Sequence, residues 1–325
     1  MPRSLLILAV LLPFATGSAQ APAADRSLRL AVENDLIAMR GAGPPPDYDY
    51  THGTRITDAR PGAPAWLRRR TGRRPECRAA AATRERGCVA SAVEIGQEIY
   101  TPRRDGTTPV AGERPYAGWL YAAGTAYLIS PGRVRSIRAA VGVTGRPAFA
   151  AEVQAAIHRL LRNDPQLGWS HQLAFEPTVV LQYDEQWVRE HALGGGGLGR
   201  VALSGGAAAG NVRAALWLGV DGTLGLPGRL PWVPIEPAVQ RPMRFYVVGG
   251  YRRELVLHDL FLDGNTFRAS PRADRRASVG QYQLGVGMRR RALALEYRHV
   301  ARGREYSAQP GPHAYGSVLL TLHHF

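Results

Sequence analysis

The sequence QYQLGVGMRR, at residues 281–290, alternates between polar or small and apolar side chains with a period of two. In a strand, Tyr282, Leu284, Val286 and Met288 lie on one face, and glutamines and glycines lie on the other. The next stretch, ALALEYRH, repeats the pattern. An apolar and aromatic face opposite a small and polar face is typical of a membrane β-barrel wall. A soluble β-sandwich is the alternative, because its strands alternate as well.

Twelve segments of this kind follow one another along the chain. Their lengths are close to the length of a strand that crosses a bilayer obliquely, which is about 9–11 residues. An even number of strands is what a single-chain bacterial barrel requires. We therefore predict an all-β fold: a twelve-stranded antiparallel transmembrane β-barrel domain over residues 24–325. The predicted strands are residues 28–38, 53–60, 91–101, 118–129, 134–145, 174–187, 197–208, 212–224, 243–257, 279–290, 292–301 and 314–325.

The N-terminal residues 1–23 predict a signal peptide, because Arg3 precedes a short apolar run and small residues follow it. The net charge is +15, and every basic residue is an arginine. For an exported chain, anionic lipid head groups and phosphates are better partners than nucleic acid, so no nucleic acid is expected. We expect a monomer in the bacterial outer membrane. Cys77 and Cys88 predict a local disulfide in this oxidising compartment.

One helix is predicted in this strand-rich chain, at residues 151–162 (AEVQAAIHRLLR), in a loop that faces outward if the first strand runs outward. Gln154 and His158 are four residues apart and project together along the border of its apolar face. Asp164 follows at the end of the helix. A histidine that polar neighbours orient can take a proton from water, so His158 is a candidate general base. The apolar face combines residues at helical spacing: Val153, Ile157, Leu160 and Leu161.

Polar residues also gather where the first two predicted strands end and begin. Asn34 and Asp35 close the first strand, Thr51 opens the second, and Asp47 and Asp49 lie between them. Carboxylate and amide oxygens at one rim suit a hard cation such as Ca²⁺, and ordinary turn chemistry is the alternative. Without a Gly-x-Ser-x-Gly elbow, hydrolysis by activated water fits the sequence better than an acyl-enzyme route.

Two further motifs allow a functional and a structural interpretation. Arg114 begins the sequence RPYAG, where an arginine can fork onto phosphate oxygens or simply support a turn. The sequence LDGNTF, at residues 262–267, could form half of a cation loop, but an Asp-Gly turn is favoured.

Together these segments resemble the outer-membrane lipid A 3′-O-deacylase family. The resemblance implies a twelve-stranded barrel with a helix in an outer loop. It also implies calcium-dependent hydrolysis of the 3′ ester of lipid A in lipopolysaccharide, at the extracellular rim, with release of an acyloxyacyl chain. The matching segments are ENDL at 33–36, YTHG at 50–53, EIGQEIYTP at 94–102, RPYAGWLY at 114–121, EVQAAIH at 152–158, GWSHQL at 168–173, GN at 210–211 and LDGNTF at 262–267.

The resemblance assigns roles residue by residue. Asn34 and Asp35 correspond to the family's pair at the cation, and Thr51 to its hydroxyl residue at the start of the second strand. Gln154 and His158 correspond to its Gln-x-x-x-His on the helix, with His158 as the base.

At the phosphate end of the site, Arg114 corresponds to the family's arginine, and Glu113 stands where the family has a lysine. We expect Glu113 to weaken phosphate binding unless it is turned away or paired with Arg103 or Arg104. Asp164 matches a family glutamate by spacing. Two other functions remain open: a phospholipase-like outer-membrane esterase, and a non-catalytic barrel that kept only the fold.

Overall fold

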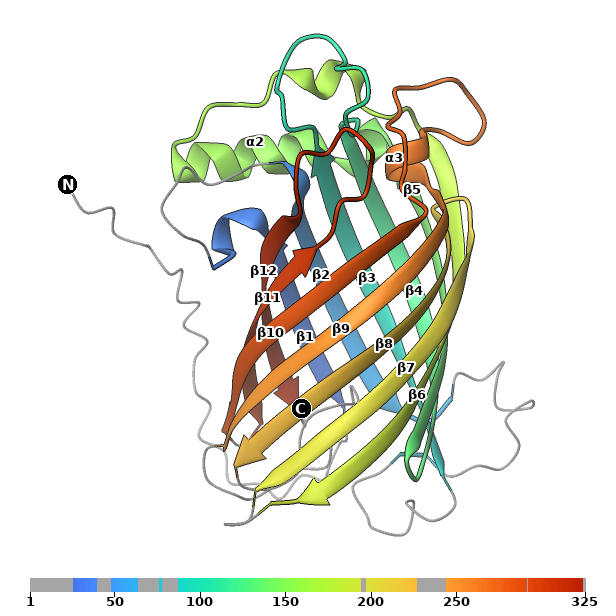
Figure 1. Ribbon diagram of the computed structural model, residues 1–325, viewed down its shortest axis with the longest axis vertical. Helices are drawn as coiled ribbons and strands as arrows, with labels where there is room; N and C mark the ends of the chain where they lie inside the picture. The colour runs from blue at the N-terminus through green and yellow to red at the C-terminus, as the bar shows by residue number, and fades with distance from the viewer. Residues whose placement is uncertain are drawn as a thin grey trace, which may run out of the picture.

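The computed structural model describes residues 26–39, 48–63, 76–77, 87–193, 197–226, 244–290 and 292–323. The predicted signal peptide lies outside the described residues. Twelve antiparallel strands pair in sequence order in this part of the chain, and β1 pairs with β12 to close the barrel (Figure 1). The strands are β1 (Ser27–Asn34), β2 (Asp49–Pro61), β3 (Cys88–Thr101), β4 (Ala117–Ser130), β5 (Arg133–Thr144), β6 (Glu176–Ala192), β7 (Leu198–Gly210), β8 (Arg213–Leu226), β9 (Arg244–Asp259), β10 (Ser278–Arg290), β11 (Leu293–Arg302) and β12 (His313–His323).

The predicted fold class is therefore confirmed, and the strand ends differ most at β6, which ends at Ala192 rather than at residue 187, and around the first loop. β1 ends at Asn34 rather than at residue 38, because the Asn34 side chain accepts a hydrogen bond of 2.7 Å from the Leu36 backbone N–H. This cap starts the short 3₁₀ helix η1 (Asp35–Ile37). β2 begins at Asp49, earlier than predicted, and a β-bulge follows between Tyr50 and His52.

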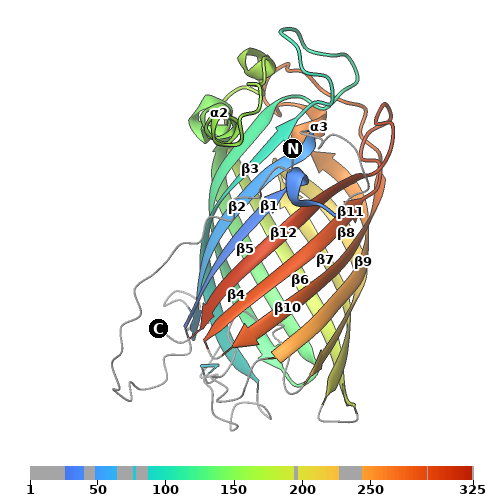
Figure 2. The same cartoon turned by 90° about the vertical axis from the view of Figure 1, so that its left-hand side faces the viewer.

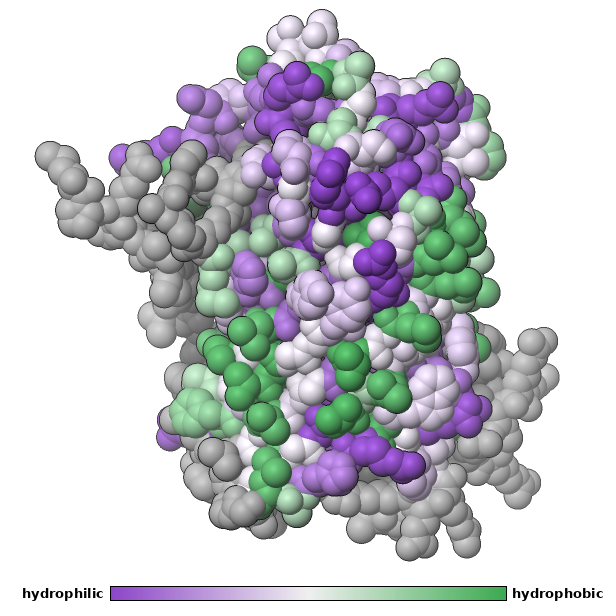
Figure 3. Space-filling model, viewed as in Figure 1, coloured by the Kyte–Doolittle hydropathy of each residue, from purple (hydrophilic) through white to green (hydrophobic). Residues whose placement is uncertain are grey.

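The alternation has the predicted orientation. Tyr282, Leu284 and Val286 are 63%, 58% and 58% exposed on the outer wall, as lipid-facing side chains are. Hydrophobic side chains spread over the strands in Figure 3, whereas hydrophilic ones gather at the end of the barrel where Figure 1 shows α2 (Ala150–Leu161) and α3 (Leu260–Asp263). Among the described residues, no helix has the length and apolar character needed to cross a membrane.

Two cysteines lie at the opposite end of the barrel from the η1 loop, in the connection between β2 and β3. Cys77 and Cys88 form a disulfide, as predicted. The bond joins a residue of the long connection to the first residue of β3. It is therefore remote from the predicted helix and from the strand ends that carry the candidate site.

The predicted helix is α2 (Ala150–Leu161), within one residue of the expected bounds. It is preceded by η3 (Arg146–Ala148) and followed by η4 (Gly168–His171), and a short helix α3 (Leu260–Asp263) follows β9. Figures 1 and 2 show α2 outside the barrel wall at its loop end, with its axis running across the barrel axis. The helix packs against β3 and β4.

Candidate functional site

A row of outward-facing positions crosses the loop ends of the first four strands. The register pairs Asn34 with His52, His52 with Ile99, and Ile99 with Gly118. These positions share the outer face with Ile95, which is 65% exposed two rows below on β3. Ile99 itself is fully buried, since α2 covers this end of the wall. The row therefore joins the predicted cation-binding rim of β1 and β2 to the docking place of the predicted catalytic helix.

Gly118 explains how α2 can lie so close to the wall. A Cβ at this position would lie 2.4 Å from the Ala150 Cβ, so a larger residue on β4 would push the helix outward. The Gln97 side chain on β3 fixes the same corner, donating a hydrogen bond of 2.6 Å to the Ala148 carbonyl. The glycine of the RPYAG motif thus has a packing role, which its position in the sequence did not reveal.

The polar face of α2 is the one that faces the barrel. Ala150, Gln154 and His158 are the buried residues of the helix. Leu160 and Leu161 are instead 77% and 49% exposed. The pair Gln154 and His158, at the border of the predicted apolar face, therefore packs against the wall.

Gln154 holds α2 to the loop that follows it. Its Oε1 accepts a hydrogen bond of 2.7 Å from the Trp169 indole N–H. Gly168 beside it allows close approach of the Tyr116 ring, because a Cβ there would lie 2.1 Å from a ring carbon. The Tyr116 hydroxyl in turn donates to the Gln166 side chain at 2.6 Å. In this structure Gln154 is thus a positioning residue for the helix.

His158 is oriented by Asp164, but through the main chain. Its Nδ1 lies 2.5 Å from the Asp164 carbonyl oxygen. A carbonyl can only accept, so Nδ1 carries the proton and the lone pair of the neutral ring is on Nε2. This is the tautomer that a general base needs. Asp164, the neighbour that the sequence spacing indicated, makes this contact through its carbonyl, and its side chain is exposed.

The residues predicted to bind a cation are partly engaged with their own loop. Asp35 is fully buried, and its Oδ2 accepts a hydrogen bond of 3.0 Å from the Tyr48 backbone N–H. The Asn34 oxygen caps η1, and the Thr51 hydroxyl pairs with that of Thr101 at 2.6 Å. Within the described ranges, no three His, Cys, Asp or Glu side chains gather closely enough to hold a metal ion.

His52 is a site neighbour whose role the sequence did not single out. Its Nδ1 lies 3.4 Å from the Asn34 side-chain nitrogen, and its Nε2 lies 2.8 Å from the Thr54 hydroxyl. Because an amide nitrogen can only donate, Nδ1 accepts and the ring fixes which way the Asn34 amide points. The strand register could have revealed this pair, but it depends on the bulge at Thr51.

Arg114 does not join the outward row. Its side chain is 1% exposed and pairs with Glu305 at 2.8 Å, inside the barrel mouth. Its Nε also lies 3.9 Å from an Asp49 oxygen. Burial alone would raise the pKa of the Glu305 carboxyl, but the charges of Arg114 and Arg302 outweigh it and lower that pKa to about 2. The carboxylate therefore stays ionised and holds the guanidinium.

Glu113, next to Arg114, is paired with Arg104, which is one of the two partners that would relieve its effect on phosphate binding. Its carboxylate accepts hydrogen bonds from the Arg104 backbone N–H at 3.0 Å and from its guanidinium Nε at 2.5 Å. The Arg104 side chain is 69% exposed. The negative charge of Glu113 is thus directed at an arginine of its own loop.

The LDGNTF motif has a structural role, as the favoured interpretation predicted. The Asn265 amide and the Thr266 backbone N–H donate to one oxygen of Glu176, at 3.1 and 2.8 Å. The Asn211 amide donates to the other oxygen at 2.8 Å. A single buried carboxylate thus ties three outer connections together.

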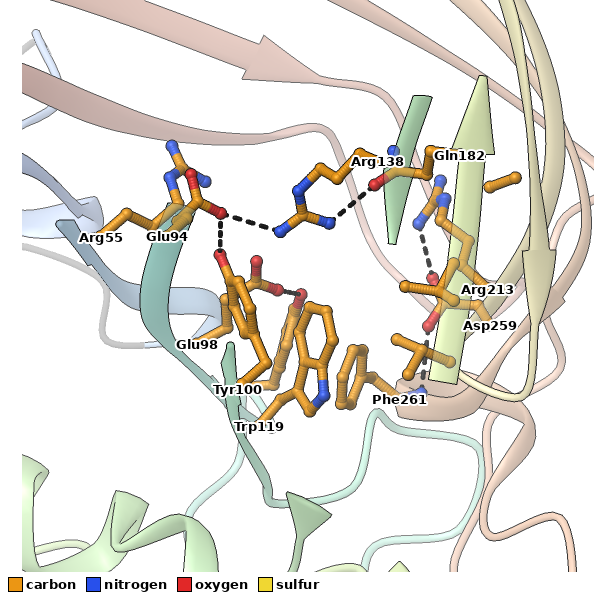
Figure 4. Close-up of a pocket in the computed structure, with 14 residues that line it drawn as sticks. Arg55, Glu94, Glu98, Tyr100, Trp119, Arg138, Gln182, Arg213, Asp259 and Phe261 are labelled. Carbon is orange, nitrogen blue, oxygen red and sulfur yellow. Dashed lines mark hydrogen bonds and ion pairs between the residues drawn. The ribbon is translucent and has the colours of Figure 1, made fainter. Parts of the chain in front are cut away.

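The barrel interior offers a cavity of 370 Å³. Its charged groups neutralise one another: Glu94 pairs with Arg138 at 2.8 Å, and Asp259 with Arg213 at 3.1 Å (Figure 4). None of the residues predicted for the site lines this cavity. The outer row, rather than the interior, is therefore the candidate site.

Comparisons with known proteins agree with this fold. The family model described as "Outer membrane protein LpxR" matches residues 5–324. The chain belongs to the LpxR family. This confirms the predicted resemblance to the outer-membrane lipid A 3′-O-deacylases, and it fits a bacterial outer-membrane location.

The solved structure of an LpxR protein shows the same fold. LpxR from Salmonella typhimurium matches at a TM-score of 0.71 and 17% identity, over 91% of this chain and 99% of that chain. The beta domain of the Bordetella autotransporter Brka matches at a TM-score of 0.43 and 10% identity, over 93% and 99%. No curated protein matches the chain.

Proposed function

We propose that this LpxR-family chain is a calcium-dependent hydrolase that removes the 3′-O-linked acyloxyacyl chain from lipid A in the outer leaflet. The observation that carries the proposal is the position of His158. The helix α2 packs on β3 and β4 and holds His158 on its buried face, where it is 6% exposed. A base at the lipid-facing rim can meet an ester of a membrane lipid without extracting the lipid from the bilayer.

In this proposal, His158 Nε2 takes a proton from the water whose oxygen attacks the ester carbonyl carbon. The same proton then passes to the 3′ oxygen of the sugar as the carbon–oxygen bond breaks. The products are a free acid and a sugar hydroxyl. The Asp164 carbonyl keeps Nδ1 protonated throughout, and Gln154 keeps the helix in place through Trp169.

The donor chemistry at the β1–β2 rim fits calcium. Asp35 offers a fully buried carboxylate, and Asn34 offers an amide oxygen next to it. Ca²⁺ takes about 6–8 oxygen ligands, including main-chain carbonyls and water, so two side chains can form part of such a set. When bound there, the ion supplies Lewis-acid stabilisation of the negative charge that develops on the ester carbonyl oxygen.

Substrate contacts in this proposal extend from Thr51 at the rim to Arg114 and Glu113 at the mouth. Because Arg114 is paired with Glu305, phosphate binding through its guanidinium requires that pair to open. Arg104 presents a more exposed guanidinium beside Glu113. All these residues belong to one barrel, so we expect a monomer to be active.

The test is to express the chain in a bacterium whose lipid A carries a 3′ acyloxyacyl chain, and to analyse total lipids by mass spectrometry. The proposal predicts lipid A that has lost this chain, and unchanged lipid A with His158→Ala at equal outer-membrane abundance. Hydrolysis of glycerophospholipids instead would support a phospholipase-like esterase. Unchanged lipids of every class would support a non-catalytic barrel, and either result contradicts the proposal.

A further inference from the structure

The helix α2 leaves its apolar stripe largely uncovered. Leu160 is 77% exposed, Leu161 is 49% exposed, and Phe149 immediately before the helix is 55% exposed. Val153 and Ile157, earlier in the same stripe, are only partly buried. Removing a leucine side chain from water lowers the free energy, so an exposed apolar stripe indicates a partner that covers it.

The stripe lies on one flank of the docked helix. At about 100° per residue, its centre is roughly a quarter-turn from the side that Gln154 and His158 press against the barrel. The opposite flank carries Glu152, Ala155 and Arg159, and both charged residues there are exposed. A helix lying flat against the wall therefore has one apolar flank and one charged flank.

The barrel wall below the helix is apolar and faces lipid. One row below Gly118, the register aligns Leu120 with Val143 on the outer face. One row further, it aligns Ala122 with Val141, which is 60% exposed. The lipid-facing belt thus begins directly beneath α2. Because the helix axis runs across the barrel axis (Figures 1 and 2), it also runs along the plane of the membrane surface.

We propose that α2 is an interfacial helix, with its apolar stripe inserted among the acyl chains of the bilayer lipids of the outer leaflet. Its charged flank faces the head groups and water, where Arg159 and Arg162 meet lipid phosphates. An amphipathic helix with arginines on its polar side binds an anionic lipid surface in this way. The barrel anchors one side of the helix, and the lipid hydrocarbon covers the stripe that the protein leaves open. This inference concerns the membrane and does not depend on the proposed hydrolysis.

The test uses the full barrel in vesicles of phosphatidylcholine with phosphatidylglycerol. A single added cysteine, Leu160→Cys, is labelled with an environment-sensitive fluorophore, and Ala155→Cys on the same helix is the matched control. The two positions lie about 140° apart around the helix axis. Heat-modifiable migration in gels shows that both variants are folded. Each is then quenched by spin-labelled lipid and, separately, by aqueous iodide.

An interfacial helix buries its apolar face about 5–10 Å into the head-group boundary, so spin-labelled lipid is expected to quench the label at 160 at least about twice as strongly as the label at 155. Iodide is expected to show the reverse order. Equal iodide quenching at both positions would overturn the proposal, because the stripe would then face water. Protection at 160 from both quenchers would also overturn it, since protein would then cover the stripe.

Discussion

Gly118→Ala tests whether the docking of α2 on β4 sets the geometry of the site. The added Cβ would lie 2.4 Å from the Ala150 Cβ, whereas ordinary contact begins at 3.4 Å, so the helix must move outward by about 1 Å. A displacement of about 1 Å at a catalytic group can lower the rate about 100-fold. We therefore expect deacylation of lipid A to fall by about this factor, because His158 moves with the helix. The barrel itself should stay folded.

The matched control is Gly124→Ala, six residues further along the same strand and on the same outer face, where an added Cβ meets nothing within 4 Å. It should keep the wild-type rate. Limited trypsin digestion at Arg159 and Arg162 gives a readout that is independent of activity, since a displaced helix is cleaved faster. A wild-type rate and unchanged digestion for Gly118→Ala would refute the reasoning, as would equal losses in both variants.

Three further predictions follow from other parts of the molecule. Glu113→Lys releases the exposed Arg104 guanidinium from its pair and adds a cation beside it, so it should speed hydrolysis of bisphosphorylated lipid A in a mass-spectrometric assay; an unchanged or slower rate would argue against a phosphate contact here. Replacing Cys77 and Cys88 by serine should lower the free energy of unfolding by about 3 kcal/mol at most, measured by urea titration, and leave activity intact, because the closed loop is short and remote from the site. The arginine partners of Glu305 lower its pKa to about 2, so the stability that its carboxylate contributes is complete above the ordinary carboxyl pKa and is lost as the pH falls through about 2. Hydrogen exchange in residues 303–312 should therefore stay slow at pH 4 in the wild type and become fast at the same pH in Glu305→Gln.

The sequence was sufficient to predict the barrel, because lipid on one side and a polar interior on the other impose a period of two on every strand. It was less informative about α2. Helical spacing identifies which residues are apolar, but it does not say whether protein or lipid covers them. In the structure, the protein leaves the apolar stripe around Leu160 exposed, and the border residues Gln154 and His158 are the ones that pack on the wall.

Contacts between distant residues could not be predicted from local patterns. Arg114 lies 191 residues from Glu305, and no local spacing connects them. The sequence therefore assigned Arg114 to a phosphate, while the fold pairs it with a carboxylate in the barrel mouth. His158 illustrates a finer limit, since the position of Asp164 was apparent but the choice of its carbonyl over its carboxylate depends on how the helix ends.

The most direct test of the central claim is hydrolysis of purified lipid A in water enriched in heavy oxygen, with mass spectrometry of the released acid. Water activated by His158 predicts that wild-type protein with calcium releases an acyloxyacyl acid that carries one heavy oxygen atom. It also predicts that His158→Ala releases none, and that chelation stops the wild-type reaction reversibly. Labelled acid released by His158→Ala at the wild-type rate, or acid released by the wild type without the label, would contradict the account.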